Sequence, residues 1–596
     1  MRSHWLGFTV AVRVWTAGIT AATAAPAPCP EALYTIVGDP VGGAGVTSSS
    51  AEIGVRAGFG DACPPTTATK RSGSASGITK VSATWTACSG LTGTVKFSGK
   101  IVDSCSRLVG TLKAKGYKRA LEAVRVDCGD GILEAEPPAT PYTGTLSSLA
   151  THALPPWFDD AKFGIMIHWG IFTIPAWAET ILNPADWLCG SKLVEPPDFG
   201  SEFFTHIPYV EWYENTIMIA GSPAQQHHIA TYGATFAYDS FRPQFEAQAA
   251  AWSGDTWADL FRDSGARYVV LVTKHHDGYA LWPTTVAHPT RSNWHMERDI
   301  VGELSTAVRQ RCMRMGLYYS GGFDWSVQAG PVKNSLDYLT VAPQSPAYIS
   351  YADGQWRELI SRYKPAILWN DLGYPTNADA LSLFADYYNT VPDGVINDRF
   401  TVVGGGTHHD YTTPEFCVVS DISPTKFETV RGMGHGFGYN QNETDADLAS
   451  ADDLIRLLID VVSKNGNLLL NVGPLADGTI PTAQVTRLQA IGAWLSANGA
   501  AIFKTHPWTV PAGATSDGTP VRFTTSADGA TLYAMVLGSL PAKEVTLVGL
   551  NVTPKKVVLL GTPAKKVKAT VAGSDLHIKI PAAPPSQAAY AFALTL

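Results

Sequence analysis

The strongest constraint on the fold is an alternation of short apolar segments with amphipathic ones, from about Pro155 to residue 505. Uninterrupted apolar strands that alternate with helices are typical of a parallel sheet covered by helices. Over about 350 residues, this repeat predicts a (β/α)8-like barrel with insertions rather than an open sheet. No Gly-x-Gly-x-x-Gly follows these segments, which excludes a dinucleotide-binding fold. The apolar segments include 163–169, 268–274, 315–320, 366–371 and 467–472, and segments with helical periodicity include 257–264, 299–313 and 353–363.

The apolar segments share a second feature, because they end in polar and aromatic side chains instead of turn residues. The carboxyl ends of the strands in a parallel barrel meet at one face, where barrel enzymes have their active sites. His, Trp, Asp and Arg at five successive strand ends therefore predict an active site at this face. The five ends are His168-Trp169, His275-His276-Asp277, Tyr318-Tyr319-Ser320, Trp369-Asn370-Asp371 and Asn397-Asp398-Arg399.

The pattern changes on both sides of the predicted barrel, which spans residues 151–505. In residues 1–25, Arg2 precedes an apolar, alanine-rich stretch, which predicts a signal peptide and a secreted or extracytoplasmic protein. Residues 26–135 predict a small β-rich, cysteine-containing module of unknown role, and the proline-rich residues 136–150 predict a linker. Short alternating segments over residues 506–596 predict a C-terminal β-sandwich. No run of about 18 apolar residues is present, so no transmembrane helix is expected.

Cysteine usage supports export, because five of the eight cysteines lie early in the chain, a pattern typical of disulfides in a secreted module. The remaining three, Cys189, Cys312 and Cys417, are scattered through the barrel, and each is expected to be a buried thiol. No Cys-x-x-Cys pair occurs, which argues against a zinc ribbon. The five early cysteines are Cys29, Cys63, Cys88, Cys105 and Cys128.

Charge and motifs exclude several classes of function. The net charge is −8, and residues 151–505 contain 22 basic against 38 acidic residues. An acidic barrel argues against nucleic acid or an anionic membrane as a partner. Paired histidines at 227–228, 275–276 and 408–409 raise the alternative of a metalloenzyme. Adjacent strand residues point to opposite faces, and neither His-x-His nor His-Glu-x-x-His occurs, so no metal and no other cofactor is expected.

Carbohydrate chemistry fits the strand ends better. Aromatic rings stack on the apolar faces of a sugar, and His, Asp, Glu and Arg hydrogen-bond its hydroxyls. Glycoside cleavage uses two carboxyl groups that flank an oxocarbenium-like transition state. Asp371, at a strand end close to Trp369 and followed by Leu372, is a candidate nucleophile.

Nine sequence blocks, in order along most of the predicted barrel, resemble the α-L-fucosidases of glycoside hydrolase family 29. The first 150 residues do not contribute to this resemblance. The blocks are Phe163-Gly-Ile-Met-Ile-His-Trp-Gly, Glu211-Trp-Tyr, Thr273-Lys-His-His-Asp-Gly-Tyr, Leu317-Tyr-Tyr-Ser-Gly-Gly-Phe-Asp-Trp, Leu368-Trp-Asn-Asp, Asn397-Asp-Arg, Asp410-Tyr-Thr-Thr-Pro-Glu, Phe437-Gly-Tyr-Asn and Gly466-Asn-Leu-Leu-Leu-Asn-Val-Gly-Pro.

The resemblance implies a (β/α)8-like barrel followed by a β-sandwich. It also implies exo hydrolysis of a terminal α-L-fucose, by double displacement with retention, on a fucosylated glycan or oligosaccharide. Asp371 aligns with the family's nucleophile. For the acid/base, Glu415 matches the position used by many bacterial members and is favoured. Glu428 is the rival, and is otherwise interpreted as a structural carboxylate.

The resemblance also implies a set of sugar-binding residues. Two adjacent histidines can serve one ligand only where the strand ends or bulges. His168, His275 and His276 match histidines that hold the fucose hydroxyls; Tyr209, Glu211 and Trp212 match the pocket edge; Tyr318 and Trp369 match residues packed around the nucleophile; Arg399 matches an arginine near the acid/base; and Phe437 matches an aromatic residue near the C6 methyl.

One departure from the family pattern is a long loop between Ala178 and His206. Because loops at this face set the leaving-group preference, the glycan linkage stays open. Two other functions stay open as well. One is an exo-glycosidase for α-L-galactosides, which Phe437 disfavours because a buried, unpaired hydroxyl is costly. The other is a carbohydrate-binding pseudoenzyme, which the presence of both carboxylates disfavours. The sequence does not indicate an oligomeric state.

Overall fold

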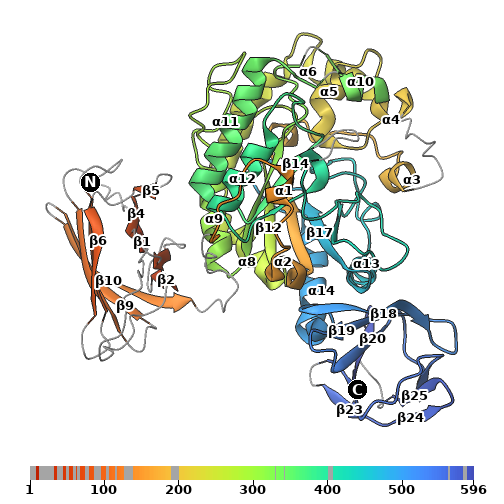
Figure 1. The fold of residues 1–596 in the computed structure, drawn as a ribbon. Helices are drawn as coiled ribbons and strands as arrows, with labels where there is room; N and C mark the ends of the chain where they lie inside the picture. The colour runs from red at the N-terminus through yellow and green to blue at the C-terminus, as the bar shows by residue number, and fades with distance from the viewer. Residues whose placement is uncertain are drawn as a thin grey trace. The chain divides into compact units, whose positions relative to one another are not determined.

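The computed structural model describes residues 138–189, 200–328, 330–340, 342–400, 407–561, 564–580 and 587–596, together with ten strands between Phe8 and Val126. Its centre is a parallel sheet of seven strands in the order β15-β14-β13-β12-β11-β17-β16 (Figure 1). The strands are β11 (Phe163–Ile167), β12 (Tyr268–Lys274), β13 (Arg314–Ser320), β14 (Ile367–Asp371), β15 (Val395–Ile396), β16 (Phe427–Arg431) and β17 (Gly466–Val472).

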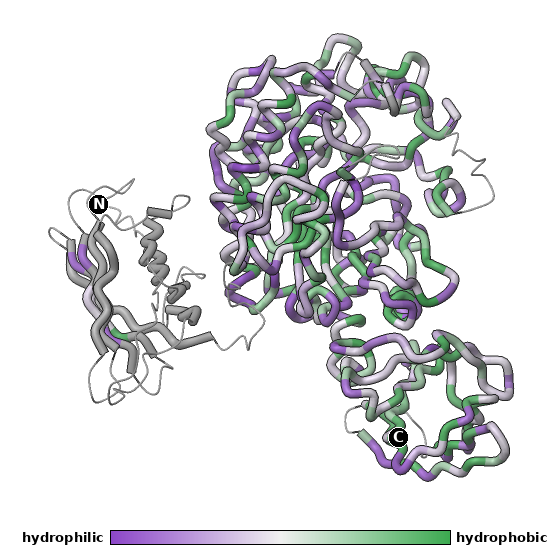
Figure 2. Tube along the Cα trace, in the orientation of Figure 1, coloured by the Kyte–Doolittle hydropathy of each residue, from purple (hydrophilic) through white to green (hydrophobic). Residues whose placement is uncertain are grey.

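Five of these strands, β11, β12, β14, β15 and β17, are buried along their whole length. A strand buried on both faces needs an uninterrupted apolar sequence, which explains why the segments do not alternate. Figure 2 shows hydrophobic residues gathered along the central strands. The predicted (β/α)8-like barrel is confirmed, with seven regular strands.

The segment 410–416 bridges the two edge strands, β15 and β16. The Asp410 N–H donates to the Ile396 carbonyl at 2.9 Å, and the Thr412 N–H donates to the Lys426 carbonyl at 3.1 Å. Single parallel bridges connect the segment to both neighbours. Pro414, in the middle of the segment, has no N–H with which to continue a regular ladder. The segment therefore takes the place of an eighth strand without forming one.

Several helices start at a residue whose side chain caps the first turn, among them α6, α9, α11 and α13. In α13, the Ser450 side chain accepts from the Asp453 N–H, and the buried face includes Leu454, Leu458 and Ile459. The helices are α1 (Leu146–Leu149), α2 (Pro156–Ala161), α3 (Pro184–Leu188), α4 (Ser201–Thr205), α5 (Tyr213–Ile217), α6 (Pro223–Tyr232), α7 (Arg242–Ala249), α8 (Gly254–Asp263), α9 (Ile300–Gln310), α10 (Ser335–Thr340), α11 (Pro346–Tyr363), α12 (Ala380–Thr390), α13 (Ala451–Ser463) and α14 (Thr482–Asn498), with 3₁₀ helices η2 (Ile171–Thr173), η3 (Val210–Trp212), η4 (Tyr238–Phe241), η5 (Asp398–Phe400) and η6 (Gly499–Ala501).

The long loop that departs from the family pattern contains α3 and α4. Cys189, directly after α3, forms a disulfide with Cys417 across 228 positions of sequence. The expectation of isolated buried thiols is therefore wrong for these two cysteines and for Cys312, which is also disulfide-bonded. Disulfide pairing depends on contacts that a single sequence does not reveal. No cysteine in the described ranges is a free thiol.

Two antiparallel sheets form the C-terminal part and confirm the predicted β-sandwich. One sheet has the order β18-β19-β20-β26-β22-β23 and the other β21-β25-β24. Apolar residues from both sheets, including Phe523, Leu547 and Phe592, share one core. The strands are β18 (Thr505–Ala514), β19 (Pro520–Ser526), β20 (Thr531–Val536), β21 (Glu544–Leu547), β22 (Lys556–Leu559), β23 (Lys565–Val567), β24 (Ala569–Ala572), β25 (Asp575–Lys579) and β26 (Tyr590–Thr595).

The N-terminal strands form antiparallel sheets of their own, with the orders β1-β4-β5 and β3-β2-β10-β9-β8-β7-β6. Most of the predicted signal peptide and four of the five early cysteines lie outside the described residues. The strands are β1 (Phe8–Val12), β2 (Ala32–Ile36), β3 (Gly45–Ser48), β4 (Ile53–Ala57), β5 (Ala62–Cys63), β6 (Thr67–Gly73), β7 (Thr79–Trp85), β8 (Val95–Val102), β9 (Arg107–Ala114) and β10 (Tyr117–Val126). Among the described residues, no helix has both the length and the hydropathy needed to cross a bilayer.

Candidate active site

A cavity that is partly open to solvent lies at the carboxyl ends of the barrel strands. All twelve predicted site residues line it: His168, Tyr209, Glu211, Trp212, His275, His276, Tyr318, Trp369, Asp371, Arg399, Glu415 and Phe437. Met166, Leu372 and Val430 also line it and were not predicted. Met166 lies two positions before His168, so the twofold repeat of a strand was the signal for it.

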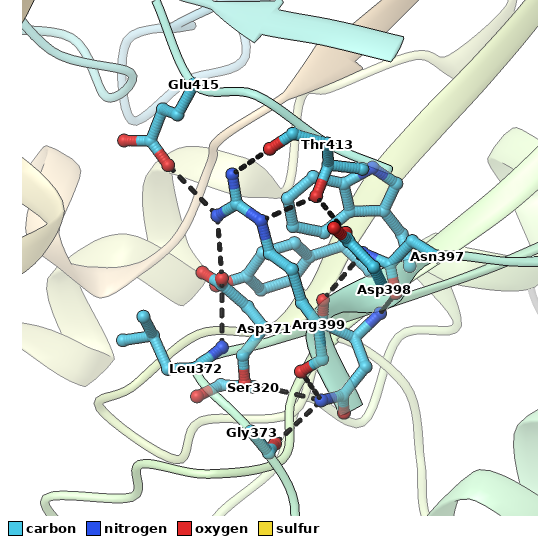
Figure 3. Close-up of polar contacts among 12 residues, drawn as sticks. Ser320, Asp371, Leu372, Gly373, Asn397, Asp398, Arg399, Thr413 and Glu415 are labelled. Carbon is cyan, nitrogen blue, oxygen red and sulfur yellow. Dashed lines mark hydrogen bonds and ion pairs between the residues drawn. The ribbon is translucent and has the colours of Figure 1, made fainter. Parts of the chain in front are cut away.

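Asp371 is the last residue of β14 and is 8% exposed. Its Oδ2 accepts from the Tyr318 hydroxyl at 2.8 Å, and its Oδ1 accepts from Arg399 Nη1 at 3.0 Å and from the Leu372 N–H at 2.9 Å (Figure 3). Burial and the neighbouring carboxylate raise the pKa of Tyr318 well above its ordinary value. The phenol therefore stays protonated and keeps donating, which holds the carboxylate in one orientation.

Glu415 lies on the segment that bridges β15 and β16. Its Oε1 accepts from the Tyr209 hydroxyl at 2.8 Å, and its Oε2 accepts from Arg399 Nη1 at 2.9 Å. Arg399 is itself anchored, because Nε donates to Thr413 Oγ1 at 2.8 Å and Nη2 donates to the Thr413 carbonyl at 3.0 Å (Figure 3). Its guanidinium also lies over the Trp369 ring, 4.7 Å from the centroid. The two carboxylates thus face one cavity and share one cation.

Arg399 stays protonated although its guanidinium is buried. Burial by itself would lower the pKa of this guanidinium, but the Glu415 and Asp371 carboxylates raise it overall. A buried cation between two carboxylates offsets their mutual repulsion. Arg399 therefore allows two acidic groups to occupy one small pocket.

The pocket histidines are held as neutral imidazoles. Burial lowers the pKa of His168 to about 4, and its Nδ1 lies 2.7 Å from Asn471 Oδ1, which as an acceptor requires Nδ1–H. His276 Nδ1 lies 2.6 Å from the Ser320 oxygen, whose own hydroxyl donates to the Phe323 carbonyl. A neutral imidazole oriented in this way offers Nε2 as an acceptor, which suits a sugar hydroxyl.

His275 and His276 line the same cavity although they are adjacent in sequence. Strand β12 ends at Lys274, and its pairing with β13 shifts register between Val272 and Lys274. The two side chains are therefore released from strict alternation, and their ring centroids lie 3.9 Å apart. Nδ1 of His275 is buried and has no hydrogen-bond partner in the structure.

Glu211 contributes a third carboxyl group to the cavity. Its Oε2 accepts from the Gly438 N–H at 2.8 Å, whereas the buried Oε1 has no partner in the structure. Burial raises the pKa of Glu211 to about 7. Phe437 packs against His168 and Tyr209, with centroids 4.9 and 5.4 Å away, and forms an apolar wall.

Glu428 does not line the cavity. It lies inside the barrel on β16, is fully buried, and accepts from the Tyr268 hydroxyl at 2.5 Å and from Trp369 Nε1 at 3.0 Å. Burial raises its pKa to about 7. The hydrogen bond from Trp369 Nε1 to Glu428 orients the indole ring. Glu415, by contrast, faces the cavity.

Among the described residues, the group His152, His408 and Asp410 brings ligand-type atoms within 4.8 Å of one another. These atoms are hydrogen-bonded locally, with His152 Nδ1 2.9 Å from Asp410 Oδ1 and the Tyr388 hydroxyl donating to Asp410 Oδ2 at 2.7 Å. None of the three lines the cavity, so the group is not part of the candidate active site.

Comparison with known proteins agrees with this geometry. The model of the family described as alpha-L-fucosidase matches residues 133–500. The tissue alpha-L-fucosidase of Bos taurus is 32% identical over 497 residues, covering 80% of this chain and 95% of that protein. The human tissue alpha-L-fucosidase is 32% identical over 488 residues, covering 78% and 93%.

A solved structure gives the same result. The Thermotoga maritima alpha-fucosidase, in complex with a mechanism-based inhibitor, is 37% identical and has a TM-score of 0.68, covering 76% of this chain and 100% of that one. The barrel and the sandwich therefore coincide with matches over nearly the full length of these relatives. The chain is a glycoside hydrolase and belongs to the α-L-fucosidase family, glycoside hydrolase family 29.

Proposed function

We propose that the protein is a secreted, exo-acting α-L-fucosidase that releases terminal α-L-fucose from glycans or oligosaccharides by double displacement with retention. The observation that carries the proposal is the arrangement of Asp371 and Glu415, which face one cavity and share Nη1 of Arg399. Their two bound oxygens lie no farther apart than the sum of 3.0 and 2.9 Å. That limit is below the roughly 6.5–9.5 Å of inverting enzymes.

In the first step, an oxygen of Asp371 attacks the anomeric carbon of the fucoside. Glu415, in its protonated form, donates a proton to the glycosidic oxygen as the bond to the leaving group breaks. The products are the free aglycone alcohol and a β-fucosyl ester of Asp371. Tyr318 and Arg399 hold the carboxylate in line for this attack.

In the second step, the Glu415 carboxylate takes a proton from a water molecule as the water attacks the anomeric carbon. The ester bond breaks, Asp371 leaves as a carboxylate, and α-L-fucose is released. Two inversions give net retention. Tyr209, which donates to Glu415, keeps the group within reach of both the leaving group and the water.

Recognition of fucose is assigned to the remaining cavity residues. The free acceptor of His168, the free Nδ1 of His275 and the free Oε1 of Glu211 suit the sugar hydroxyls, because buried polar atoms without partners are costly until a ligand satisfies them. Phe437 is assigned to the C6 methyl group. The Phe437 ring offers no hydrogen-bond partner to the C6 hydroxyl of an α-L-galactoside, which disfavours that sugar because a buried, unpaired hydroxyl is costly.

Export and domain organisation belong to the same proposal. Residues 1–25 are assigned as the signal peptide, 26–135 as a module of unknown role, 136–150 as a linker, 151–505 as the catalytic barrel and 506–596 as the sandwich. The alanine-rich stretch after Arg2 supports the signal peptide, and the Cys189–Cys417 disulfide supports an oxidising compartment.

The test is hydrolysis of nitrophenyl α-L-fucoside, measured beside nitrophenyl α-L-galactoside and nitrophenyl β-D-galactoside. We expect the α-L-fucoside to have the highest kcat/KM. A higher value on the α-L-galactoside would transfer the assignment to that sugar. Binding of fucose without turnover of any of the three would indicate a pseudoenzyme, which the presence of both carboxylates disfavours.

A further inference from the structure

The Cys189–Cys417 disulfide lies two residues from Glu415 in sequence and touches its backbone. Sγ of Cys189 lies 3.7 Å from the Glu415 carbonyl oxygen, and Sγ of Cys417 lies 3.3 Å from the Leu188 carbonyl oxygen. The bond therefore joins the end of α3 directly to the segment that carries Glu415. The Cα atoms of the two cysteines are 5.4 Å apart, within the usual range.

On the barrel side, the segment 414–417 is attached to β16, where the Thr429 hydroxyl donates to the Cys417 carbonyl at 3.0 Å. The Phe416 N–H donates to the Val430 carbonyl at 2.9 Å, and the Val430 N–H donates to the Pro414 carbonyl at 3.1 Å. Phe416 has a φ of 56°, a left-handed conformation that non-glycine residues keep only when their surroundings impose it. One such constraint is β16, on one edge of the segment. The disulfide supplies another through Cys417, the residue that follows Phe416.

On the other side, α3 is a helix of only five residues. A helix of this length is not stable by itself and depends on external contacts. Leu182, Trp187 and Leu188 pack against the apolar cluster beside the cavity, and the Leu182 carbonyl lies 2.9 Å from His435 Nδ1. These contacts therefore hold α3 in place, and the disulfide joins the Glu415 segment to a helix that is itself packed against the barrel.

The side chain of Glu415 depends on this arrangement, because its two partners come from elsewhere in the chain. Tyr209 precedes η3, and Arg399 lies in η5. Both hydrogen bonds, at 2.8 and 2.9 Å, require that the backbone of residue 415 stays in place. A shift of about 1 Å in a catalytic group is enough to lower a rate by orders of magnitude.

We propose that the Cys189–Cys417 disulfide is a positioning element for the acid/base Glu415, which it holds within reach of the leaving group and of the attacking water. The inference rests on the assignment of Glu415 in the proposed function. It makes the loop that departs from the family pattern part of the catalytic support. Loss of the bond is expected to impair proton transfer and to leave nucleophilic attack by Asp371 intact.

The experiment compares wild type, the Cys189→Ser/Cys417→Ser double variant and Glu415→Gln. Each is assayed on a fucosyl-oligosaccharide and on an activated dinitrophenyl fucoside, with and without azide. The oligosaccharide requires an acid for departure of its leaving group, whereas dinitrophenolate leaves unaided. The size of the initial dinitrophenolate burst counts the sites in which Asp371 is functional, so it controls for folding.

For the double variant we expect kcat on the oligosaccharide to fall about 10- to 100-fold. On the aryl fucoside, a full burst should be followed by slow turnover, which azide restores to within about threefold of wild type because an anionic nucleophile needs no base. An equal loss on both substrates that azide does not relieve, or unchanged activity, would overturn the proposal.

Reduction provides a second route that does not depend on the variants being produced in folded form. Dithiothreitol converts the disulfide to two thiols and is itself oxidised to a cyclic disulfide. Reductant should produce the same leaving-group dependence in wild type, reversibly, and should cause no further loss in the double variant. If Glu415→Gln shows no leaving-group dependence and no azide rescue, the acid/base assignment fails. If it shows both while the double variant shows neither, only the positioning role fails.

Discussion

Asp371 and Glu415 accept hydrogen bonds from the same nitrogen atom, Nη1 of Arg399, at 3.0 and 2.9 Å. The nucleophile and the acid/base of the proposed mechanism are therefore connected before any substrate binds. One group approaches from the end of β14, and the other from the irregular segment that closes the barrel. This connection bears on the stereochemical course of the proposed mechanism.

The first prediction concerns that course. If Asp371 and Glu415 are the carboxylate pair of a double displacement, the first-formed product of an α-fucoside should be α-L-fucose. Proton NMR of the early reaction mixture, before mutarotation, distinguishes the two anomers. Initial appearance of the β-anomer would contradict the double-displacement mechanism.

The second prediction concerns Asp371. Asp371→Gly should lower kcat by at least about a thousandfold, because the group that forms the covalent bond is missing. Azide should occupy the vacated space and attack in its place, giving β-fucosyl azide from an activated α-fucoside. Circular dichroism should show an unchanged fold. A variant that keeps most of its activity would exclude Asp371 as the nucleophile.

The third prediction separates Glu415 from Glu428 with the same isosteric change. Glu415→Gln should lose about 100-fold or more on a fucosyl-oligosaccharide and much less on an activated aryl fucoside, because an acid assists only a poor leaving group. Glu428→Gln should lower kcat/KM on both substrates alike, through Trp369. If the leaving-group dependence and azide rescue appear only in Glu428→Gln, the two roles must be exchanged.

The fourth prediction follows from the burial of Glu428. Its pKa is about 7 in the folded protein, against 4.5 ordinarily. Between pH 4.5 and about pH 7, Glu428 is protonated in the folded protein and ionised in the unfolded chain. The contribution of Glu428 to the free energy of unfolding is therefore fully present below pH 4.5 and is lost as pH rises through about 7. Glu428→Gln should remove this dependence. Relative to wild type, the variant should gain on the order of 1–3 kcal/mol between about pH 4 and pH 8.

Denaturant unfolding of both proteins at several pH values measures this difference. Tyr268 and Trp369 both donate to Glu428, and a glutamine can accept only through its oxygen. The absolute stability of the variant is therefore expected to be lower at acid pH. A constant difference between the two proteins across the whole range would contradict a buried carboxyl that titrates near neutrality.

The fifth prediction concerns Phe437, whose ring packs against His168, Tyr209 and Phe416. Phe437→Ser should raise the ratio of kcat/KM on α-L-galactoside to that on α-L-fucoside about tenfold, because it replaces an apolar wall with space and a hydroxyl. Phe437→Leu is the matched control and should leave the ratio nearly unchanged. An unchanged ratio in both variants would remove Phe437 from the C6 subsite.

The strands and the residues at their ends could be predicted because both depend on local patterns. Apolar runs such as 268–274 are long enough to be read as buried strands, and their carboxyl ends meet at one face in any parallel barrel. The placement of both His275 and His276 in the cavity was harder to predict, because adjacent side chains on a regular strand point to opposite faces of the sheet. The end of β12 at Lys274 and its shift in register brought both to the cavity.

The periodicity of the sequence predicted the barrel and the sandwich, and position at the strand ends predicted site residues such as His168, His275, Asp371 and Arg399, because both are properties of neighbouring residues. The other predicted site residues, among them Glu415 and Phe437, were implied only by the resemblance to the α-L-fucosidase family. Only the tertiary structure shows how differently Glu415 and Glu428 are placed, although they lie thirteen positions apart in one stretch of sequence. Glu415 faces the cavity and accepts from Arg399, whereas Glu428 is buried inside the barrel and accepts from Trp369. The pairing of Cys189 with Cys417 was likewise decided only in three dimensions, since it joins segments 228 positions apart whose proximity depends on the closure of the whole barrel.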